Sequence, residues 1–158
     1  MKKLLRFLEK NAKLTPEELA LMCEKEVGDI KRMLDSCEKE GIILGYTTVI
    51  DWDKTDSEYV SALIELKVTP RAGSGYDAIA ERIYNYPEVE SVYLMSGGFD
   101  LAVMLRGKTM REVAVFVASK LAILDAVTST ATHFILRKYK DHGITFGAVE
   151  QDERGNCI

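Results

Sequence analysis

The first fifty positions carry apolar residues at helical spacing in three short segments. The first has an apolar face at Leu4, Leu5 and Leu8. The second begins at Thr15-Pro16-Glu17-Glu18, a capping box with proline at the first helical position. The third has an i, i+3, i+4, i+7 stripe, which predicts an amphipathic helix that ends at a C-terminal glycine. Its stripe is Ile30, Met33, Leu34 and Cys37, and the glycine is Gly41.

A β-rich segment follows directly, from Ile42 to Ile50. Three short helices followed by a β segment are typical of a winged helix-turn-helix, whose third helix enters a DNA groove. We therefore expect a DNA-binding domain over residues 1–50. The next stretch, 51–58, is polar and turn-rich, and it is expected to be a linker.

The rest of the chain alternates between the period of strands and the period of helices. The predicted order is strand, helix, strand, strand, helix, strand, which is the ferredoxin-like βαββαβ arrangement of an α+β protein. The expected ranges are 60–68, 76–83, 89–95, 99–106, 109–121 and 127–139. This domain is expected to span 59–146, followed by a tail over 147–158. Because both helices would cover one face of the sheet, the bare face predicts a homodimer.

The predicted second and third strands are joined by the loop Ser96-Gly97-Gly98-Phe99-Asp100. Adjacent glycines leave backbone amides open to a ligand, and Asp100 supplies one carboxylate. Amides beside a single acid suit a small zwitterion, because the amides hold its carboxylate and the acid holds its ammonium. The alternative is a plain hairpin turn, since glycine is a usual turn residue.

Composition and charge narrow the classes of protein. The chain has 158 residues, of which 47% are apolar and 29% are charged, as in soluble globular proteins. No apolar run reaches the roughly 20 residues of a membrane span, and the basic N-terminus lacks a signal-peptide core, so a cytoplasmic location is expected. The three cysteines, Cys23, Cys37 and Cys157, form no CxxC pair and no metal spacing, so no metal site is predicted.

The predicted DNA-binding domain is electrically neutral. Residues 1–50 contain nine Lys or Arg and nine Asp or Glu, and the whole chain has a net charge of −4. Indiscriminate binding of nucleic acid is therefore not expected. The net charge does not exclude a local surface that reads DNA. The candidate DNA-binding residues are Lys31, Arg32 and Asp29 on the third helix, with Lys2 and Lys3 at the N-terminus.

Four stretches carry motifs in a specific order and spacing. They cover 38–46, 89–100, 127–132 and 134–140, and the first three are similar to the patterns EEGVIxGY, V…TGxYD and VxxTxT. With the predicted elements, the chain resembles the Lrp/AsnC family of leucine-responsive and asparagine-responsive transcription regulators, over roughly residues 1–146. The resemblance implies double-stranded DNA as a partner and a small-molecule effector, usually an amino acid.

The resemblance also implies where the effector binds and how the chains assemble. The effector would lie between subunits of a multimer built from dimers, a tetramer or an octamer, and no other cofactor is implied. The implied effector-binding residues are Ser96, Gly97, Gly98, Phe99, Asp100, Thr130 and Thr132.

Two other functions remain open. Where the family's reading helix has further arginines, this chain has Met33 and Ser36, and the absence of each good base contact costs roughly 1–3 kcal/mol. The second hypothesis is therefore an effector-binding oligomer whose DNA-reading head is weakened or lost. The third is an enzyme resembling tetrapyrrole decarboxylases of this two-domain architecture. Because His133 and His142 form no catalytic constellation that we can identify, we do not expect an enzyme.

Overall fold

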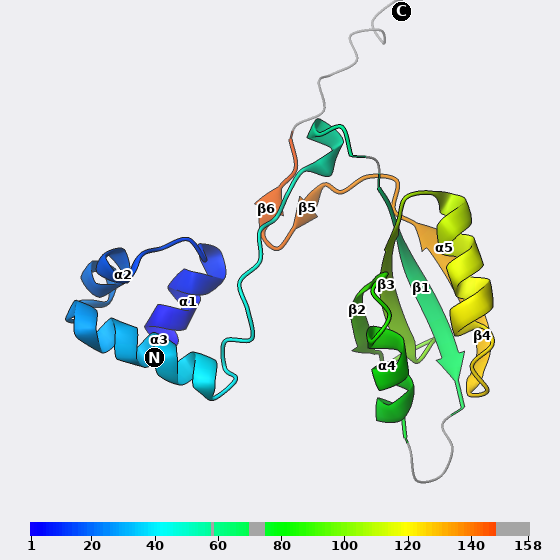
Figure 1. Ribbon diagram of the computed structural model, residues 1–158, viewed down its shortest axis with the longest axis horizontal. Coiled ribbons are helices and arrows are strands. Elements are labelled where there is room, and N and C mark those ends of the chain that lie inside the picture. The colour runs from blue at the N-terminus through cyan, green and yellow to red at the C-terminus, as the bar shows by residue number, and fades with distance from the viewer. Residues whose placement is uncertain (58, 70–74, 148–158) are drawn as a thin grey trace, which may run out of the picture. The chain divides into compact units, whose positions relative to one another are not determined.

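The computed structural model describes residues 1–57, 59–69 and 75–147 (Figure 1). Contacts within the chain divide it into two compact units. One comprises residues 1–50 with the segment that begins at Lys140, and the other runs from Asp51 to Tyr139. Each unit has its own buried core.

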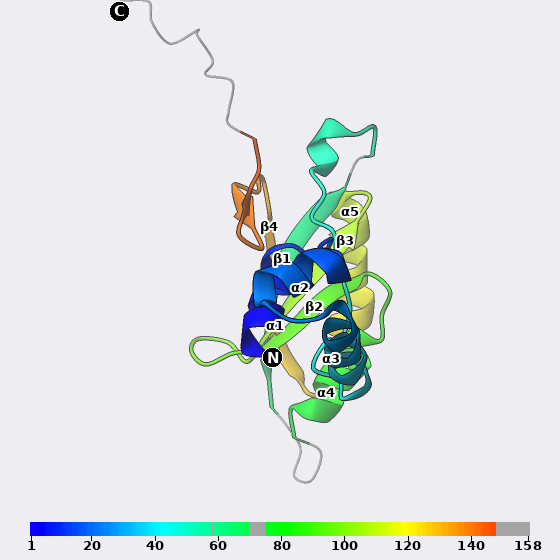
Figure 2. The same cartoon turned by 90° about the vertical axis from the view of Figure 1, so that its left-hand side faces the viewer.

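The first unit is built on three helices, α1 (Lys2–Lys10), α2 (Pro16–Cys23) and α3 (Val27–Lys39), seen from a second side in Figure 2. The predicted capping box is confirmed. The Glu18 N–H donates to the Thr15 hydroxyl at 3.2 Å, and the Thr15 N–H donates to the Glu18 carboxylate at 2.8 Å. The buried core of this unit consists of Leu4, Leu8, Leu19, Ala20 and Ile30.

Left-handed backbone conformations end α2 and α3. Glu24 follows α2 with φ 56°, in the short turn that leads to α3. Gly41 follows α3 with φ 68°, where the N–H groups of Ile42 and Ile43 both donate to the Cys37 carbonyl, at 2.8 and 3.0 Å. The predicted glycine stop is thus confirmed.

The β segment predicted from Ile42 to Ile50 is wrong, because these residues form no strand. A strand needs a neighbour for its N–H and C=O groups, and the described part of the chain offers none there. Leu44 is 93% exposed and Tyr46 is 53% exposed. The Tyr46 hydroxyl donates to Glu38 Oε1 at 2.9 Å, and this hydrogen bond is the main reason that the pKa of Tyr46 is raised.

The second unit has the predicted βαββαβ order. Its antiparallel strands lie in the order β2-β3-β1-β4. The elements are β1 (Val60–Val68), α4 (Asp77–Tyr84), β2 (Val89–Leu94), β3 (Leu101–Gly107), α5 (Met110–Phe116) and β4 (Val127–Phe134). A π-helical segment, η2 (Val117–Leu121), continues α5, and a 3₁₀ turn, η1 (Trp52–Lys54), precedes β1.

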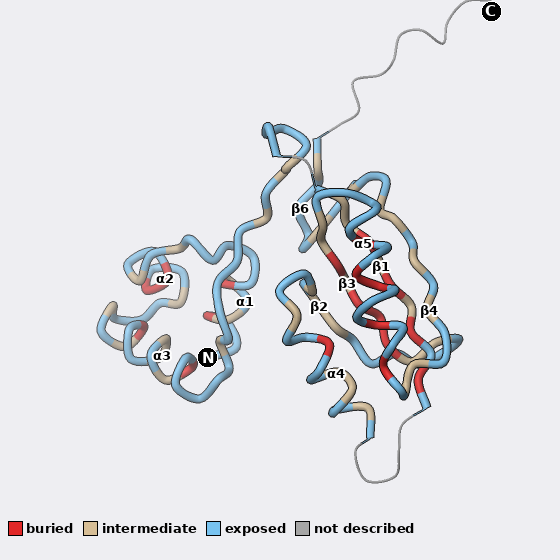
Figure 3. Tube along the Cα trace, turned by 45° about the vertical axis from the view of Figure 1, so that its right-hand side comes forward, coloured by how far each residue is buried: buried red, intermediate tan, exposed pale blue. Residues whose placement is uncertain are grey.

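Both α4 and α5 cover the same face of the sheet (Figure 1). On β1 the alternate residues Ala62, Ile64, Leu66 and Val68 are buried beneath the helices, as the red positions in Figure 3 show. The strand register places a second set of residues on the opposite face, which α4 and α5 do not cover. This set includes Leu63, Glu65, Lys67, Met104, Arg106 and His133.

The chain after β4 differs from the prediction. β4 ends at Phe134, although the pattern predicted a strand as far as Tyr139. A short hairpin follows instead, formed by β5 (Lys140–Asp141) and β6 (Ile144–Thr145). Its turn residues His142 and Gly143 have φ 45° and 80°, as a tight hairpin turn requires. The predicted tail over 147–158 lies outside the described residues from position 148 onward.

Gly107 allows α5 to pack closely against the end of β3. A Cβ at Gly107 would lie 3.0 Å from Cγ2 of Val113, a buried and conformationally stiff side chain. Gly107→Ala is therefore expected to lower the free energy of unfolding by about 1–3 kcal/mol. The control is Gly28→Ala in α3, where a Cβ meets open space and a gain of about 0.5–1 kcal/mol is expected. Chemical denaturation followed by circular dichroism measures both, and equal stability of the two variants would contradict this packing.

Candidate effector and DNA-binding sites

The loop between β2 and β3 is closed at its base and open at its tip. The Met95 N–H donates to the Asp100 carbonyl at 2.8 Å. Gly97 has φ 134°, a conformation that favours glycine, and a Cβ at Gly98 would meet open space. Among the described residues, no hydrogen-bond partner is found for the N–H groups of residues 96–99. The tip therefore presents free backbone donors to solvent.

Asp100 connects the loop to two other segments. Its N–H donates to the Leu66 carbonyl at 2.9 Å, and its Oδ2 accepts the Val68 N–H at 2.8 Å. Its Oδ1 accepts the Tyr76 hydroxyl at 3.4 Å, just before α4. The half-buried carboxylate thus holds the start of β3 against the end of β1. Because a carboxylate offers about four acceptor positions, these two donors from the described residues leave room for an ammonium group.

The two candidate threonines lie across the sheet from this loop. Leu101 of β3 pairs with Leu66 of β1, and Leu66 pairs with Thr130 of β4. Thr130 is therefore at the same end of the sheet as the loop, separated from β3 by two strand spacings, about 10 Å. Thr132 pairs with Ile64, one step further from that end. Both threonines are half-buried on the face that the helices cover.

The structure thus brings the predicted effector residues to one end of the sheet. Phe99 is half-buried, while Ser96 to Gly98 are exposed. None of the predicted effector residues lines a cavity of about 540 Å³ at the other end of β3, around Leu105 and Gly107.

Sequence reasoning missed Tyr76, which contacts Asp100 directly. The apolar pattern places this residue only on the buried face of the predicted helix and says nothing of its phenolic oxygen. A tyrosine at the start of a helix gives no local signal of a partner 24 positions away. The contact depends on the closed sheet, so spacing in the sequence does not predict it.

Three of the four candidate DNA-binding cations are paired with acids of their own unit, and no ion pair is found for Lys2 among the described residues. Lys3 lies 3.5 Å from Glu24, and Lys31 lies 4.0 Å from Glu17. Arg32 forms an ion pair with Asp29, one turn earlier on α3. Asp29 is therefore the ion-pair partner of a candidate DNA-binding cation. The side chains of Lys31 and Arg32 are 60% and 77% exposed, and such surface pairs contribute only about 0–1 kcal/mol each.

The fold joins a helix-turn-helix unit to a ferredoxin-like sheet, the architecture of a DNA-binding regulator with a separate ligand-binding domain. Residues 61–145 match the Lrp/AsnC ligand binding domain. The uncharacterized HTH-type transcriptional regulator YugG of Bacillus subtilis is 49% identical over 152 residues, 96% of this chain and 92% of YugG. The chain belongs to the Lrp/AsnC family, as its motifs predicted.

More distant relatives agree with this assignment. The HTH-type transcriptional regulator FL11 of Pyrococcus furiosus is 26% identical over 140 residues, 89% of each chain. The crystal structure of the complex of the Neisseria meningitidis transcriptional regulator NMB0573 with L-Met superposes with a TM-score of 0.70 at 23% identity. That alignment covers 88% of this chain and 89% of the other, and it confirms the predicted fold.

None of the helices in the described residues is long and apolar enough to cross a membrane, and no group of three or more His, Cys, Asp or Glu side chains that could hold a metal ion is found there. His133 Nε2 lies 3.3 Å from Glu65 Oε1 in the sheet, and His142 Nδ1 lies 2.9 Å from Asp141. Cys37 is buried and Cys23 is half-buried, both as free thiols. Cys157 lies outside the described part of the chain.

The Arg32–Asp29 pair gives a direct test of the reading helix. Asp29→Asn leaves the Arg32 guanidinium without its carboxylate, so DNA affinity is expected to rise by up to about fivefold. The matched control is Asp35→Asn, which removes an equal charge from α3 at a position with no ion pair among the described residues. Fluorescence anisotropy with a labelled DNA fragment measures both affinities. Equal gains in the two variants, or a gain that persists in Arg32→Ala, would show that Arg32 does not contact DNA.

Proposed function

We propose that the chain is a DNA-binding transcription regulator whose sheet unit binds an amino acid or a related small metabolite. The observation that carries this proposal is one chain that contains both the α2–α3 helix-turn-helix and the Lrp/AsnC ligand binding domain. The curated relatives YugG and FL11 are both named as HTH-type transcriptional regulators. The L-Met bound to NMB0573 makes L-methionine the first compound to test here.

In the proposed DNA complex, the N-terminal half of α3 lies in the major groove. Phosphate groups replace Glu17 and Asp29 as partners of Lys31 and Arg32. Because both ion pairs are exposed to water, this exchange costs little. Lys2 and Lys3 add contacts to the sugar-phosphate backbone, which position the protein without reading the sequence.

In the proposed effector complex, the free N–H groups of residues 96–99 hold the carboxylate of the amino acid. The carboxylate of Asp100 holds its ammonium group, in competition with the long 3.4 Å contact from the Tyr76 hydroxyl. Thr130 and Thr132 add hydroxyl groups from β4 at the same end of the sheet. Effector binding would thereby change the contact between Asp100 and Tyr76, the residue that precedes α4.

We propose a homodimer as the basic assembly, with tetramers or octamers built from it. The sheet face that α4 and α5 leave uncovered supports this proposal, since it contains Leu63 and Met104. The exposed apolar residues Ile42, Leu44 and Tyr46 add a second surface that is uncovered in a single chain. An effector then controls DNA binding only if it binds one assembly state more tightly than another.

The second candidate function is an effector-binding oligomer with a weakened reading head. The observations that favour it are the ion pairs of Lys3, Lys31 and Arg32 with acids, together with Met33 and Ser36 on α3. This protein would bind the effector and assemble but would select no DNA sequence. The enzyme hypothesis has no support from the named relatives, which are transcriptional regulators.

Asp100→Asn is the sharpest test of the effector site. Asparagine keeps an oxygen that accepts the Val68 N–H, but it loses the charge that an ammonium group needs. We expect the affinity of the loop for an amino acid effector to fall roughly tenfold or more, while the fold is kept. Isothermal titration calorimetry with L-methionine and other L-amino acids measures the loss.

The matched control for this test is Tyr76→Phe. It removes the hydroxyl that competes for the Asp100 carboxylate and leaves the charge of that carboxylate, so effector affinity is expected to stay the same or rise. Loss of folded structure in Asp100→Asn, seen by circular dichroism, would show that the residue is structural. Unchanged effector binding in that variant would place the ammonium elsewhere.

A further inference from the structure

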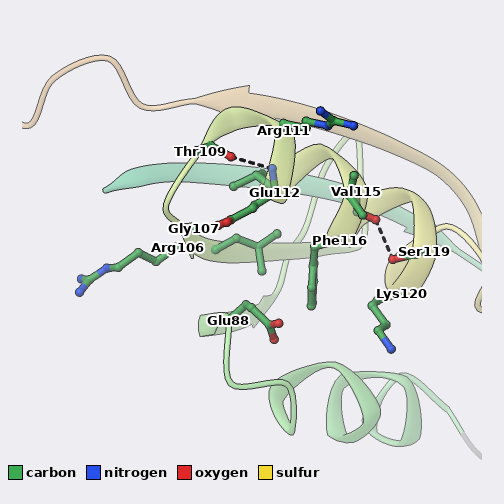
Figure 4. Close-up of a pocket in the computed structure, with 12 residues that line it drawn as sticks. Glu88, Arg106, Gly107, Thr109, Arg111, Glu112, Val115, Phe116, Ser119 and Lys120 are labelled. Atoms are coloured by element: carbon green, nitrogen blue, oxygen red, sulfur yellow. Dashed lines mark hydrogen bonds between the residues drawn. The ribbon is translucent and has the colours of Figure 1, made fainter. Parts of the chain in front are cut away.

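A groove lies on the helix-covered face of the sheet (Figure 4). It is at the end of β3 opposite the loop at Asp100. Its volume is about 540 Å³, and its floor contains the buried side chains of Leu105, Val113 and Phe116. One wall is the α5–η2 helix, and the other is the segment that enters β2 at Glu88. Because β3 rises about 3.3 Å per residue, the groove lies roughly 20 Å from the loop along this strand.

Several polar groups of the helical wall already have partners. The Glu112 N–H donates to the Thr109 hydroxyl at 3.1 Å, and the Glu112 carboxylate accepts the Lys108 N–H at 2.8 Å. The Ser119 hydroxyl donates to the Val115 carbonyl at 2.7 Å. These groups cap and continue the helix, so they are not available as the main contacts of a ligand.

Two of the basic residues around the groove are also poorly placed to hold a ligand in it. Arg106 forms an ion pair with Glu90 and lies over the ring of Tyr59, at 5.2 Å from its centroid. Arg111 lies on the side of α5 that faces away from Glu88, as Figure 4 shows. Neither side chain reaches over the apolar floor.

Glu88 and Lys120 are the charges that remain, and they approach the same apolar space from opposite walls (Figure 4). Lys120 Nζ lies 5.9 Å from the centroid of the Tyr86 ring, which packs edge-on against Phe116 at 5.3 Å. Among the described residues, no ion pair or hydrogen bond is found for the Glu88 carboxylate. The two charges do not pair with each other, so each is available to an ion of opposite sign.

We propose that this groove binds a free α-amino acid with an apolar side chain. Lys120 holds its carboxylate, Glu88 holds its ammonium group, and its side chain lies on Leu105, Val113 and Phe116. A simple anion would meet repulsion from Glu88, and a simple cation would meet repulsion from Lys120. A zwitterion with an apolar tail satisfies both charges and the floor together. The site is separate from the loop at Asp100 and does not depend on the effector function proposed there.

The experiment uses the full-length Asp100→Asn protein, in which the loop is expected to bind weakly. L-Methionine, L-leucine and L-phenylalanine are the probes, titrated by calorimetry. Lys120→Met and Glu88→Gln, each added to this background, are expected to weaken binding at least about tenfold, because each removes a charge-assisted contact. The matched control is Lys108→Met, which removes a neighbouring charge that does not line the groove.

Modified probes test each charge separately. N-acetyl-L-methionine lacks the ammonium group, and L-methioninamide lacks the carboxylate. Both are expected to bind the groove at least about tenfold more weakly than L-methionine, the first because it cannot pair with Glu88 and the second because it cannot pair with Lys120.

The outcomes separate the two sites. Binding that survives Asp100→Asn and is lost in Lys120→Met supports the groove. Binding that Asp100→Asn abolishes completely, or that Lys120→Met and Glu88→Gln leave unchanged, overturns the groove and leaves the loop as the site. Absence of binding for every probe in both the natural sequence and Asp100→Asn overturns both sites.

Discussion

The sheet unit depends on the two faces of β1. This strand pairs with β3 on one side and with β4 on the other, and its residues Ala62, Ile64, Leu66 and Val68 are buried beneath the helices. The same alternation places Leu63, Glu65 and Lys67 on the face opposite α4 and α5. One strand thus determines both the core of the unit and the surface that a second chain is proposed to cover. Asp100 then fixes the end of this strand through the N–H of Val68.

The helical unit is electrically neutral because acidic residues balance its basic residues in number. This balance is compatible with the proposed binding of DNA. Three basic residues of the unit, Lys3, Lys31 and Arg32, are paired with acids at the surface, where ion pairs are weak and exchangeable. In the proposed DNA complex, a phosphate group would compete with Glu17 and Asp29 for Lys31 and Arg32. Such a unit would bind any DNA less strongly than a basic one, so its selectivity would depend more on base contacts from α3.

Periodicity in the sequence predicted most of the elements, because apolar spacing reflects which side of a helix or strand is buried. Local sequence signals also predicted the capping box at Thr15 and the glycine stop at Gly41, and periodicity predicted the βαββαβ order. The β segment over 42–50 failed for a physical reason. Its apolar side chains favour a strand, but a strand also needs a partner that the described part of one chain does not supply.

The candidate sites were less predictable than the fold. The loop from Ser96 to Asp100 was recognisable from its glycines and its acid, whereas the contact of Asp100 with Tyr76 required the closed sheet. The groove was not predictable at all. Its charged residues, Glu88 and Lys120, are far apart in the sequence, and in the sequence alone each is an ordinary exposed residue. They come together only because the α5–η2 helix packs beside the segment that enters β2.

The central claim is that the chain recognises specific DNA, and selection of genomic fragments by the purified protein tests it most directly. The selection is carried out at about 150 mM salt, where nonspecific binding to phosphate is already weak. The predicted result is the recovery of a few discrete fragments. Their retention is expected to change when an amino acid effector is added. Recovery of no fragment by folded protein, with or without amino acids, would contradict the account and favour an effector-binding oligomer that no longer reads DNA.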